Sequence, residues 1–320
     1  MSTGAPETRR RLRVAEYALV AATIAEATVF SAIAPGFFSV ANALNIALSI
    51  AVTGILAVGM TAVILTGGID LSVGSVVALS GVGAAMAAAT GAPAIVPIAV
   101  ALAIGLTTGL VNGTFIAYFK VPAFVVTLAM LTVARGLAFI VSSGRSIGDL
   151  PDSFGVLGRS LVGRVPTPVL VMAGVLAIGA FVLDRTVFGR HVYATGGNAE
   201  AAWLAGIDTR RVIWIVYALN GLLVGLGGLT LASRLGAGVP NAGLQYELDV
   251  IAAVVVGGTS LTGGRGTIGG TISGTIFIGV LTNGLNLANI DPYVQKIALG
   301  VVIVGAVVAD QVSRRRGART

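Results

Sequence analysis

The chain contains no cysteine and a single histidine, His191. The absence of cysteine excludes disulfide bonds, thiol catalysis and metal sites built on cysteine ligands. One histidine is too few for a cluster of histidine ligands. We therefore expect no metal and no cofactor.

Charged residues are also scarce. They make up 10% of the 320 residues, whereas hydrophobic residues make up 56%, and the mean hydropathy is +0.96. A soluble domain has about 25% charged residues, so this chain has too few polar side chains to cover a surface that faces water. Its apolar residues come in runs of about 20, the length that crosses a hydrocarbon core of about 30 Å. The composition predicts an all-α, polytopic transmembrane helical bundle.

Motifs for nucleotide hydrolysis and other catalysis are missing. No G-x-x-x-x-G-K-[ST] phosphate loop occurs, because the glycine-rich run Gly264-Arg265-Gly266-Thr267 lacks the lysine and its spacing. There is no Ser-His-Asp set, G-x-S-x-G elbow or carboxylate pair in a hydrolase context. The net charge of +7 is not accompanied by the alternation of aromatic and basic residues typical of nucleic-acid binding. We expect a chain that is neither an enzyme nor a nucleic-acid-binding protein.

Ten apolar stretches have the pattern of membrane spans, although the eighth is short. The first resembles a signal peptide, but it is longer than an ordinary h-region and carries Glu16 and Glu26, so we interpret it as a retained span. The predicted organisation is a basic N-terminal tail (1–13), a single transmembrane domain (14–310) with a cytoplasmic loop at 185–211, and a basic C-terminal tail (311–320). The ten stretches are 14–34, 44–66, 71–90, 94–118, 122–141, 167–184, 212–234, 247–259, 267–290 and 294–310.

The distribution of arginine and lysine predicts the orientation of these spans. With the N-terminus in the cytoplasm, an even number of crossings returns the C-terminus there and places 14 of the 20 basic residues inside, against four outside. Basic residues accumulate on the cytoplasmic side of membrane proteins. We therefore expect about ten spans with both termini in the cytoplasm, and an external loop at 142–166.

Polar side chains inside the spans are the candidates for a solute path, because they are costly to bury in lipid. Amide and carboxylate groups suit a polyhydroxylated solute, since they offer donors and acceptors to its hydroxyl groups. Each also has a structural interpretation: an N-cap for Asp70, a solvated rim for Glu247 and Asp249, and an ion pair for Arg135. The tentative path residues are Asn45, Asp70, Arg135, Asn220, Glu247, Asp249, Asn283 and Asn286.

Glycine is abundant, with 45 residues, and recurs at helical spacing in Gly105, Gly109 and Gly113. Small residues let membrane helices approach closely, so packing is their expected role.

The run Gly67–Gly74 also resembles Gly257–Gly264 at an offset of 190 residues. Duplicated halves are common in transporters, but chance could supply this match in so glycine-rich a chain, and both explanations stay open.

Residues 194–207 within the cytoplasmic loop have the pattern of a short helix. Asn198 is a candidate N-cap, Glu200 suits the positive end of the helix, and Gly206 suits the C-terminal turn.

Four runs of the sequence, in the same order, resemble the permeases of ribose-type ABC importers. They are Ala57–Thr61 with Ile69–Ser75, Gly189–Ala194 with Gly196–Asn198, Tyr246–Asp249 with Gly257–Leu261, and Asn283–Leu287. The likeness extends over residues 35–310, nearly the whole chain.

The resemblance implies a set of partners and a location. They are a second permease copy, forming a homodimer around one central path, ABC ATPase subunits in the cytoplasm, and an external sugar-binding protein that delivers a monosaccharide such as ribose, xylose, arabinose or galactose. The lipid bilayer is that of the bacterial inner membrane. In this family the cytoplasmic loop before the seventh span docks on the ATPase, and the resemblance carries that role to Gly197, Asn198, Ala202 and Gly206.

Two alternatives remain beside a sugar permease. One is an ABC permease for a non-sugar small polar solute. The other is a secondary transporter coupled to an ion, for which Glu26 is the plausible carboxylate near the middle of the membrane.

Overall fold

The computed structural model describes the backbone of residues 5–317 and the side chains of residues 17–308. The ends of the two predicted tails, residues 1–4 and 318–320, lie outside the described residues. The described part of the chain is almost entirely helical. Its α-helices are Ala5–Ile33 (α1), Val40–Leu65 (α2), Val73–Ala89 (α3), Ile95–Ala117 (α4), Ala123–Val141 (α5), Val156–Arg159 (α6), Thr167–Arg185 (α7), Val187–Gly197 (α8), Ala199–Leu204 (α9), Thr209–Leu235 (α10), Tyr246–Val256 (α11), Ile268–Leu287 (α12) and Pro292–Gly317 (α13).

Each of the ten predicted spans coincides with one of these helices. Among the described residues, six helices are long and apolar enough to cross a membrane, namely α2, α4, α5, α7, α10 and α12. Shorter apolar helices lie in α1, α3 and α13, and α11 has only 11 residues. At 1.5 Å per residue α11 is about 16 Å long, roughly half of a hydrocarbon core. The helical membrane fold is confirmed, while the number of crossings stays a prediction.

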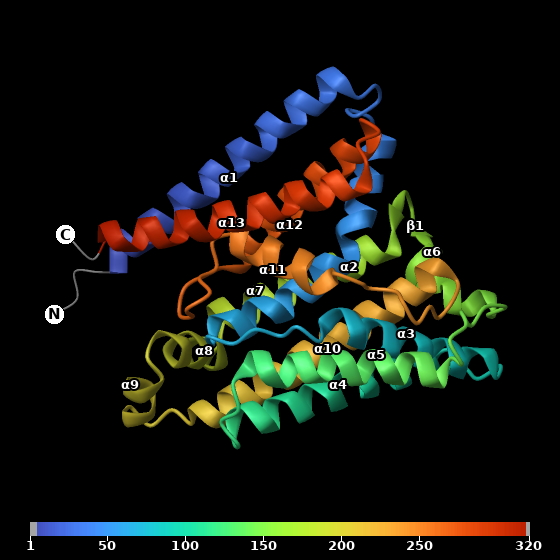
Figure 1. Cartoon of the computed structure of the whole chain (residues 1–320), viewed down its shortest axis with the longest axis horizontal. Coiled ribbons are helices and arrows are strands. Elements are labelled where there is room, and N and C mark those ends of the chain that lie inside the picture. The colour runs from blue at the N-terminus through green and yellow to red at the C-terminus, as the bar shows by residue number, and fades with distance from the viewer. Residues whose placement is uncertain (1–4, 318–320) are drawn as a thin grey trace.

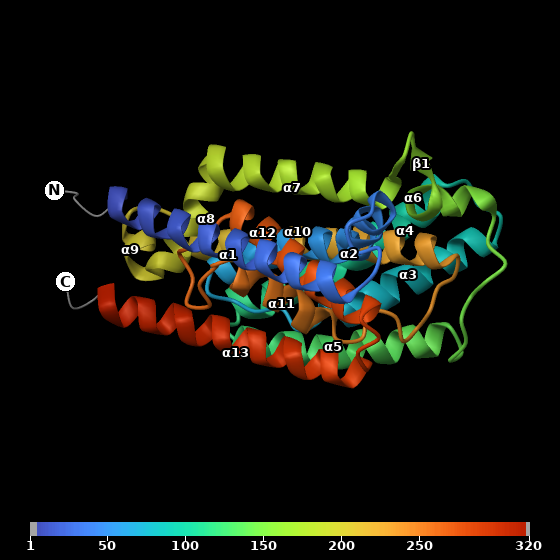
Figure 2. The same cartoon turned by 90° about the horizontal axis from the view of Figure 1, so that it is seen from above.

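The helices run along the long axis of an elongated bundle (Figure 1). At one end lie α8 and α9, together with the start of α1 and the end of α13 (Figures 1 and 2). At the other end lie α6, a 3-10 turn at Asp152–Gly155 and a small antiparallel hairpin made of Leu161–Val162 (β1) and Val165–Pro166 (β2). The predicted loops 185–211 and 142–166 therefore lie at opposite ends of the molecule.

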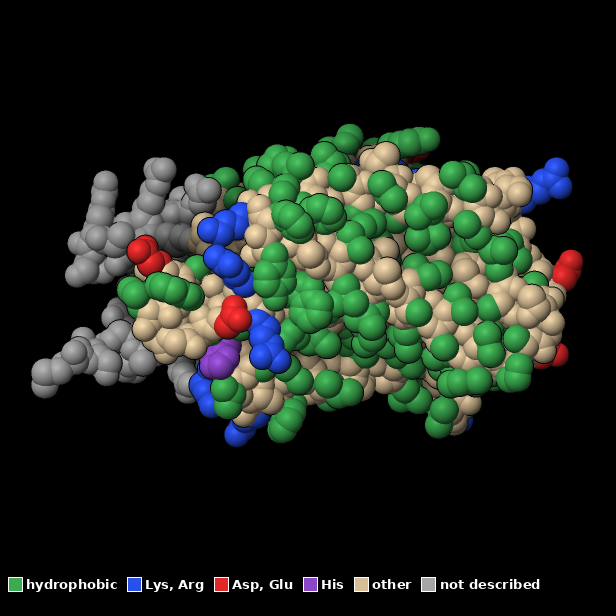
Figure 3. All heavy atoms as spheres, turned by 90° about the horizontal axis from the view of Figure 1, so that it is seen from below, with side chains coloured by type: hydrophobic (Ala, Val, Ile, Leu, Met, Phe, Trp, Pro, Cys, Tyr) green, Lys and Arg blue, Asp and Glu red, His purple; other side chains and the backbone are tan. Residues whose placement is uncertain are grey.

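The kinds of side chain on the surface change along the long axis of the bundle. Hydrophobic side chains cover the flank that Figure 3 shows, and lysine and arginine side chains gather near the end formed by α8 and α9. Large apolar side chains on the outer faces of α5 and α7 are exposed, among them Phe124, Ile140 and Phe181. An apolar flank between two charged ends is the surface that a bilayer requires.

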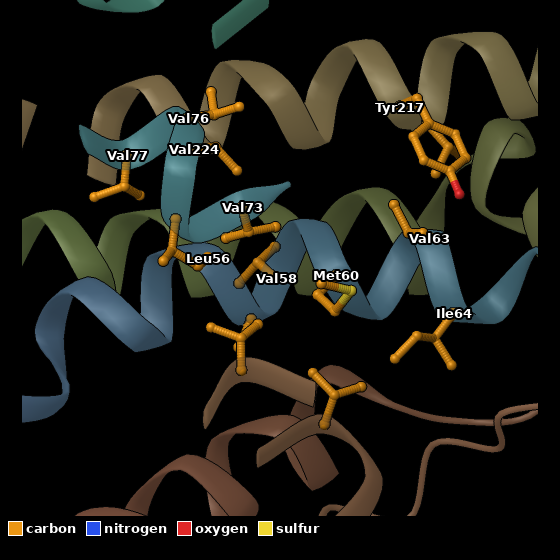
Figure 4. Close-up of a cluster of buried hydrophobic side chains, with 14 of the residues drawn as sticks. Leu56, Val58, Met60, Val63, Ile64, Val73, Val76, Val77, Tyr217 and Val224 are labelled. Atoms are coloured by element: carbon orange, nitrogen blue, oxygen red, sulfur yellow. The ribbon is translucent and has the colours of Figure 1, made fainter. Parts of the chain in front are cut away.

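The interior is centred on the contact of α2, α3 and α10. Leu56, Val63, Val73, Tyr217 and Val224 are buried there and point toward one another (Figure 4). A side chain as large as Tyr217 has no exposed surface in this position.

Glycines bring neighbouring helices into backbone contact, as predicted. A Cβ atom at Gly105 or Gly109 of α4 would overlap the backbone carbonyl groups of Gly221 or Tyr217 in α10. Likewise, a Cβ atom at Gly274 of α12 would overlap the carbonyl of Ala253 in α11. Such close approach gives membrane helices the van der Waals contact that holds them together.

Two short helices begin inside the bundle after non-helical segments. Residues 68–72 have no regular secondary structure and lead into α3, and residues 236–245 lead into α11. Gly74, at the start of α3, lies directly against the carbonyl of Gly243 and the carboxylate of Glu247, so the N-termini of α3 and α11 lie close together.

The two glycine runs noted in the sequence end their helices in the same way. After α2, the amide of Gly68 donates to the carbonyl of Val63 at 3.1 Å, and after α11 the amide of Thr259 donates to that of Val254 at 3.1 Å. The residues in the left-handed conformation are Gly67 (φ 82°) and Gly258 (φ 87°), which is the usual place of glycine after a helix. These equivalent residues are 191 positions apart, one more than the sequence match predicts.

Two local predictions were wrong or incomplete. Ser72 occupies the N-cap position of α3 without a side-chain capping hydrogen bond, whereas Asp70 lies two residues earlier and its carboxylate accepts a hydrogen bond from the amide of Ser72. The helix α8 was not predicted, because Gly189, Gly196 and Gly197 lower the helix propensity of its sequence.

Candidate functional site

A buried polar cluster surrounds Asp70 at the entrance to α3. Its Oδ1 accepts hydrogen bonds from the amide and the hydroxyl of Ser72, at 2.9 and 2.6 Å, and its Oδ2 accepts one from the Asn220 side chain of α10 at 2.8 Å. Asn112 of α4 donates to the Ser72 hydroxyl at 3.2 Å. The cluster joins the non-helical segment 68–72 to α4 and α10.

The side chains of this cluster are buried in the interior of the helical bundle. Asp70 is buried, and Asn220 has no exposed surface because its side chain packs against Gly59. The hydroxyl of Tyr217 reaches the carbonyl of Ile69 at 3.3 Å from the same side. The geometry gives Asp70 and Asn220 a structural task, which is to hold the non-helical segment inside the bundle.

Arg135 lies in α5 and holds the segment 236–245. Its Nη1 donates to the carbonyls of Pro240 and Ala242, both at 2.9 Å. Closer to the end of the bundle that carries α6 and the hairpin, Gly238 and Ile147 exchange two backbone hydrogen bonds of 2.9 Å. The segment is therefore fastened at two places between α5, α3 and the loop that follows α5.

Two carboxylates stand in the first turn of α11. Glu247 interacts electrostatically with Arg135, and Asp249 with Lys296 of α13. Both carboxylates are half-buried, while Leu248 between them is exposed. The positive end of the α11 dipole favours negative charge at these positions. Arg135, Glu247 and Asp249 thus form a second group of predicted path residues that the structure brings together, beside the pair Asp70 and Asn220.

The remaining candidates lie elsewhere. Asn283 of α12 forms a reciprocal pair with Asn42 of α2, in which each side-chain amide donates to the other, at 2.9 and 3.0 Å. Asn286 accepts a hydrogen bond from Gln295 at 2.9 Å, and Asn45 is exposed. Sequence reasoning missed Asn42, which precedes the predicted start of its span, and Gln295; nothing in the sequence pairs them with their partners.

The predicted short helix in the loop 185–211 is α9, and its ends are as expected. Asn198 caps it by accepting a hydrogen bond from the amide of Ala201 at 2.9 Å, and Gly206 turns the chain with φ 87°. Trp203 and Leu204 are 66% and 73% exposed, whereas Ala202 is only 5% exposed. Trp203 and Leu204 are therefore the large apolar side chains on the exposed surface of α9, and Ala202 faces the protein.

Comparison with known proteins identifies the family to which this chain belongs. Residues 42–307 match the family model described as the permease component of branched-chain amino acid transport systems. The ribose import permease of Haemophilus influenzae is 45% identical over 88% of each chain, and that of Bacillus subtilis is 45% identical over the same share. The xylose transport system permease of Escherichia coli is 36% identical over 96% of this chain and 94% of its own. This chain belongs to the ribose-type permease family. No solved structure matches it.

The family assignment agrees with the apolar flank and makes the chain a multi-pass membrane permease. Within the described residues, a cavity of about 230 Å³ lies between α3, α4 and the segment around Phe154, and its walls are mainly apolar. Arg135, Glu247 and Asp249 do not line this cavity. Arg135 lies in α5, and the two carboxylates lie in α11, which packs against α13. Figure 2 shows α5 and α13 along the same flank of the bundle.

Proposed function

We propose that this permease is the membrane subunit of an ABC importer that carries a monosaccharide into the cytoplasm by alternating access. The observation that supports it best is the pair of carboxylates, Glu247 and Asp249, at the start of the short helix α11 on an otherwise apolar bundle. Charged groups at membrane depth mark water-filled paths or paired interfaces. Short helices that begin inside the bundle are typical of transporter binding sites.

The path in this proposal runs along the side formed by α5, α11 and α13, and a second copy of the permease supplies its other wall. A homodimer explains why these carboxylates lie on an outer side of one chain: the dimer encloses them and spares them contact with lipid. Segment 236–245, held by Arg135, then closes the external half of the path.

The proposed topology has ten crossings in the bacterial inner membrane, with α8, α9 and both termini in the cytoplasm. The shared end of α1, α13, α8 and α9 supports it (Figure 1). Single cysteines at the exposed positions Ser153 and Glu200 test it cleanly, because the native chain has no cysteine. An impermeant maleimide added to intact cells should label Ser153→Cys alone, and labelling of Glu200→Cys alone would reverse the orientation.

ATP hydrolysis in this proposal belongs to a separate ATPase that docks on α9. The exposed pair Trp203 and Leu204 supplies an apolar anchor of the kind that fills clefts at interfaces. Leu204→Asp should therefore release the ATPase from the purified complex, whereas Leu161→Asp, in the hairpin at the opposite end, should leave it bound. Retention of the ATPase by Leu204→Asp would exclude this surface.

The substrate class follows from the curated relatives, whose names specify ribose and xylose. The description of the family model favours a second candidate, a branched-chain amino acid. ATPase activity of the complex with its binding protein should rise with ribose or xylose and stay basal with leucine. Stimulation by leucine alone would assign the permease to the second class.

A further inference from the structure

Three segments meet through bare backbone at the end of the bundle that carries α8 and α9. They are the end of α2 at Leu65, the end of α8 at Gly196 and Gly197, and the loop 257–266 between α11 and α12. A Cβ atom at Gly196 would overlap the carbonyl of Leu65 and would lie 2.8 Å from the amide nitrogen of Gly264. That amide donates to the same Leu65 carbonyl at 2.9 Å. No side chain at Gly196 separates α8 from the loop, so a displacement of one is passed directly to the other.

A side chain adds a second link between α8 and the loop. The hydroxyl of Tyr193 donates a hydrogen bond of 2.9 Å to the carbonyl of Gly266. Burial, with the nearby charge of Asp184, raises the pKa of Tyr193 to about 12, so the hydroxyl keeps its proton at physiological pH. The loop is also braced internally, since the amide of Ser260 donates to the carbonyl of Arg265 at 2.8 Å. It can therefore move as one piece.

Chain connectivity extends these contacts in both directions. On one side, α8 is joined to α9 through the single residue Asn198. On the other side, the loop begins at Gly257, the residue that ends α11, and α11 carries Glu247 and Asp249 in its first turn. The contact between α8 and the loop thus lies between the exposed pair Trp203 and Leu204 and the two carboxylates.

We propose that the loop 257–266 transmits the movement of α8 and α9 to α11, and that Tyr193 is the positioning residue that couples α8 to this loop. This inference rests on the proposed function. It gives the glycine run Gly257–Gly264 a role in transmitting movement. The first run takes part as well, because the loop packs on the end of α2 at Gly67. Glycine is required at Gly196, Gly263 and Gly264, because a Cβ atom there would overlap the backbone of the facing segment.

The test uses the complete importer in lipid nanodiscs, with its ATPase and binding protein, and D-ribose as the probe. Tyr193→Phe removes the hydroxyl and keeps the ring. It should lower the stimulation of ATP hydrolysis by ribose about two- to tenfold, the effect of one ordinary hydrogen bond on an equilibrium, and leave basal hydrolysis unchanged. Tyr118→Phe, at the exposed end of α4, is the matched control and should behave as wild type.

A cross-link provides a readout that a purely structural defect would not produce. Gly197 and Arg265 are both exposed, and their Cα atoms lie within about 8 Å, since Gly264 touches Gly197 and precedes Arg265. In a Gly197→Cys, Arg265→Cys, Tyr193→Phe variant, a short flexible dithiol-reactive linker should restore stimulation, and the single-cysteine variants should gain nothing.

Stimulation of Tyr193→Phe at the wild-type level would overturn the inference. So would a loss of stimulation that the cross-link does not restore, because the contact would then not be the route of transmission. A wild-type complex that does not respond to any sugar would instead overturn the proposed function.

Discussion

Replacement of Arg135 by methionine tests whether segment 236–245 closes the external half of the path. The substitution keeps an unbranched chain in place of the aliphatic part of arginine and removes the nitrogen that donates to the carbonyls of Pro240 and Ala242, at 2.9 Å each. A hydrogen bond from a charged donor contributes about 1.5–3 kcal/mol. Taking about 3 kcal/mol for the two bonds together, the open population of the segment should rise about a hundredfold, because each 1.4 kcal/mol is a factor of about ten.

The rate of thiol labelling reports this population directly. A cysteine at the partly buried position Ala242 should react with an external maleimide about a hundred times faster in Arg135→Met than with Arg135 present. Uptake of sugar should fall, although the protein remains inserted in the membrane. Arg145→Met, whose side chain is exposed in the loop that follows α5, is the control and should change neither the labelling rate nor the uptake rate. Unchanged labelling together with wild-type uptake in Arg135→Met would refute the closing role of the segment.

Two further substitutions test the packing of the bundle. Asp70→Leu should lower the midpoint of thermal unfolding in detergent, because the buried amide groups of Ser72 and Asn220 lose their acceptor at a cost of about 1–3 kcal/mol each; equal stability of Asp70→Leu and Asp70→Asn would contradict it. Gly109→Leu should separate α4 from α10 and reduce the yield of folded protein, whereas Gly136→Leu in α5, where a Cβ atom meets nothing within 4 Å, should be tolerated. Equal yields would show that the close contact is dispensable.

Most helices could be predicted because the length of an apolar run is a local property. The ten predicted spans coincide with ten helices, and even the short eighth span corresponds to α11. The turn chemistry at Asn198 and Gly206 is equally local, and both predictions were confirmed. The resemblance to ribose-type permeases was also confirmed, since it rests on the order of several separate motifs.

The partners of polar side chains could not be predicted, because they depend on which helices meet. Asp70 has the local sequence of an N-cap, but its carboxylate bonds to Ser72 and to Asn220, which lies 150 residues away in the chain. Asn283, a predicted path residue, is paired with Asn42, which lies 241 residues away in the chain. The resemblance carried a docking role to Ala202, whereas the orientation of α9 buries that residue and exposes its neighbours.

Uptake of labelled ribose into proteoliposomes tests the central claim most directly. The vesicles would contain the permease and its ATPase, with the binding protein outside and ATP inside. We predict accumulation of ribose that requires both ATP and the binding protein and that persists when a protonophore collapses the proton gradient. Accumulation that needs no ATP and is abolished by the protonophore would contradict the claim and identify a secondary transporter.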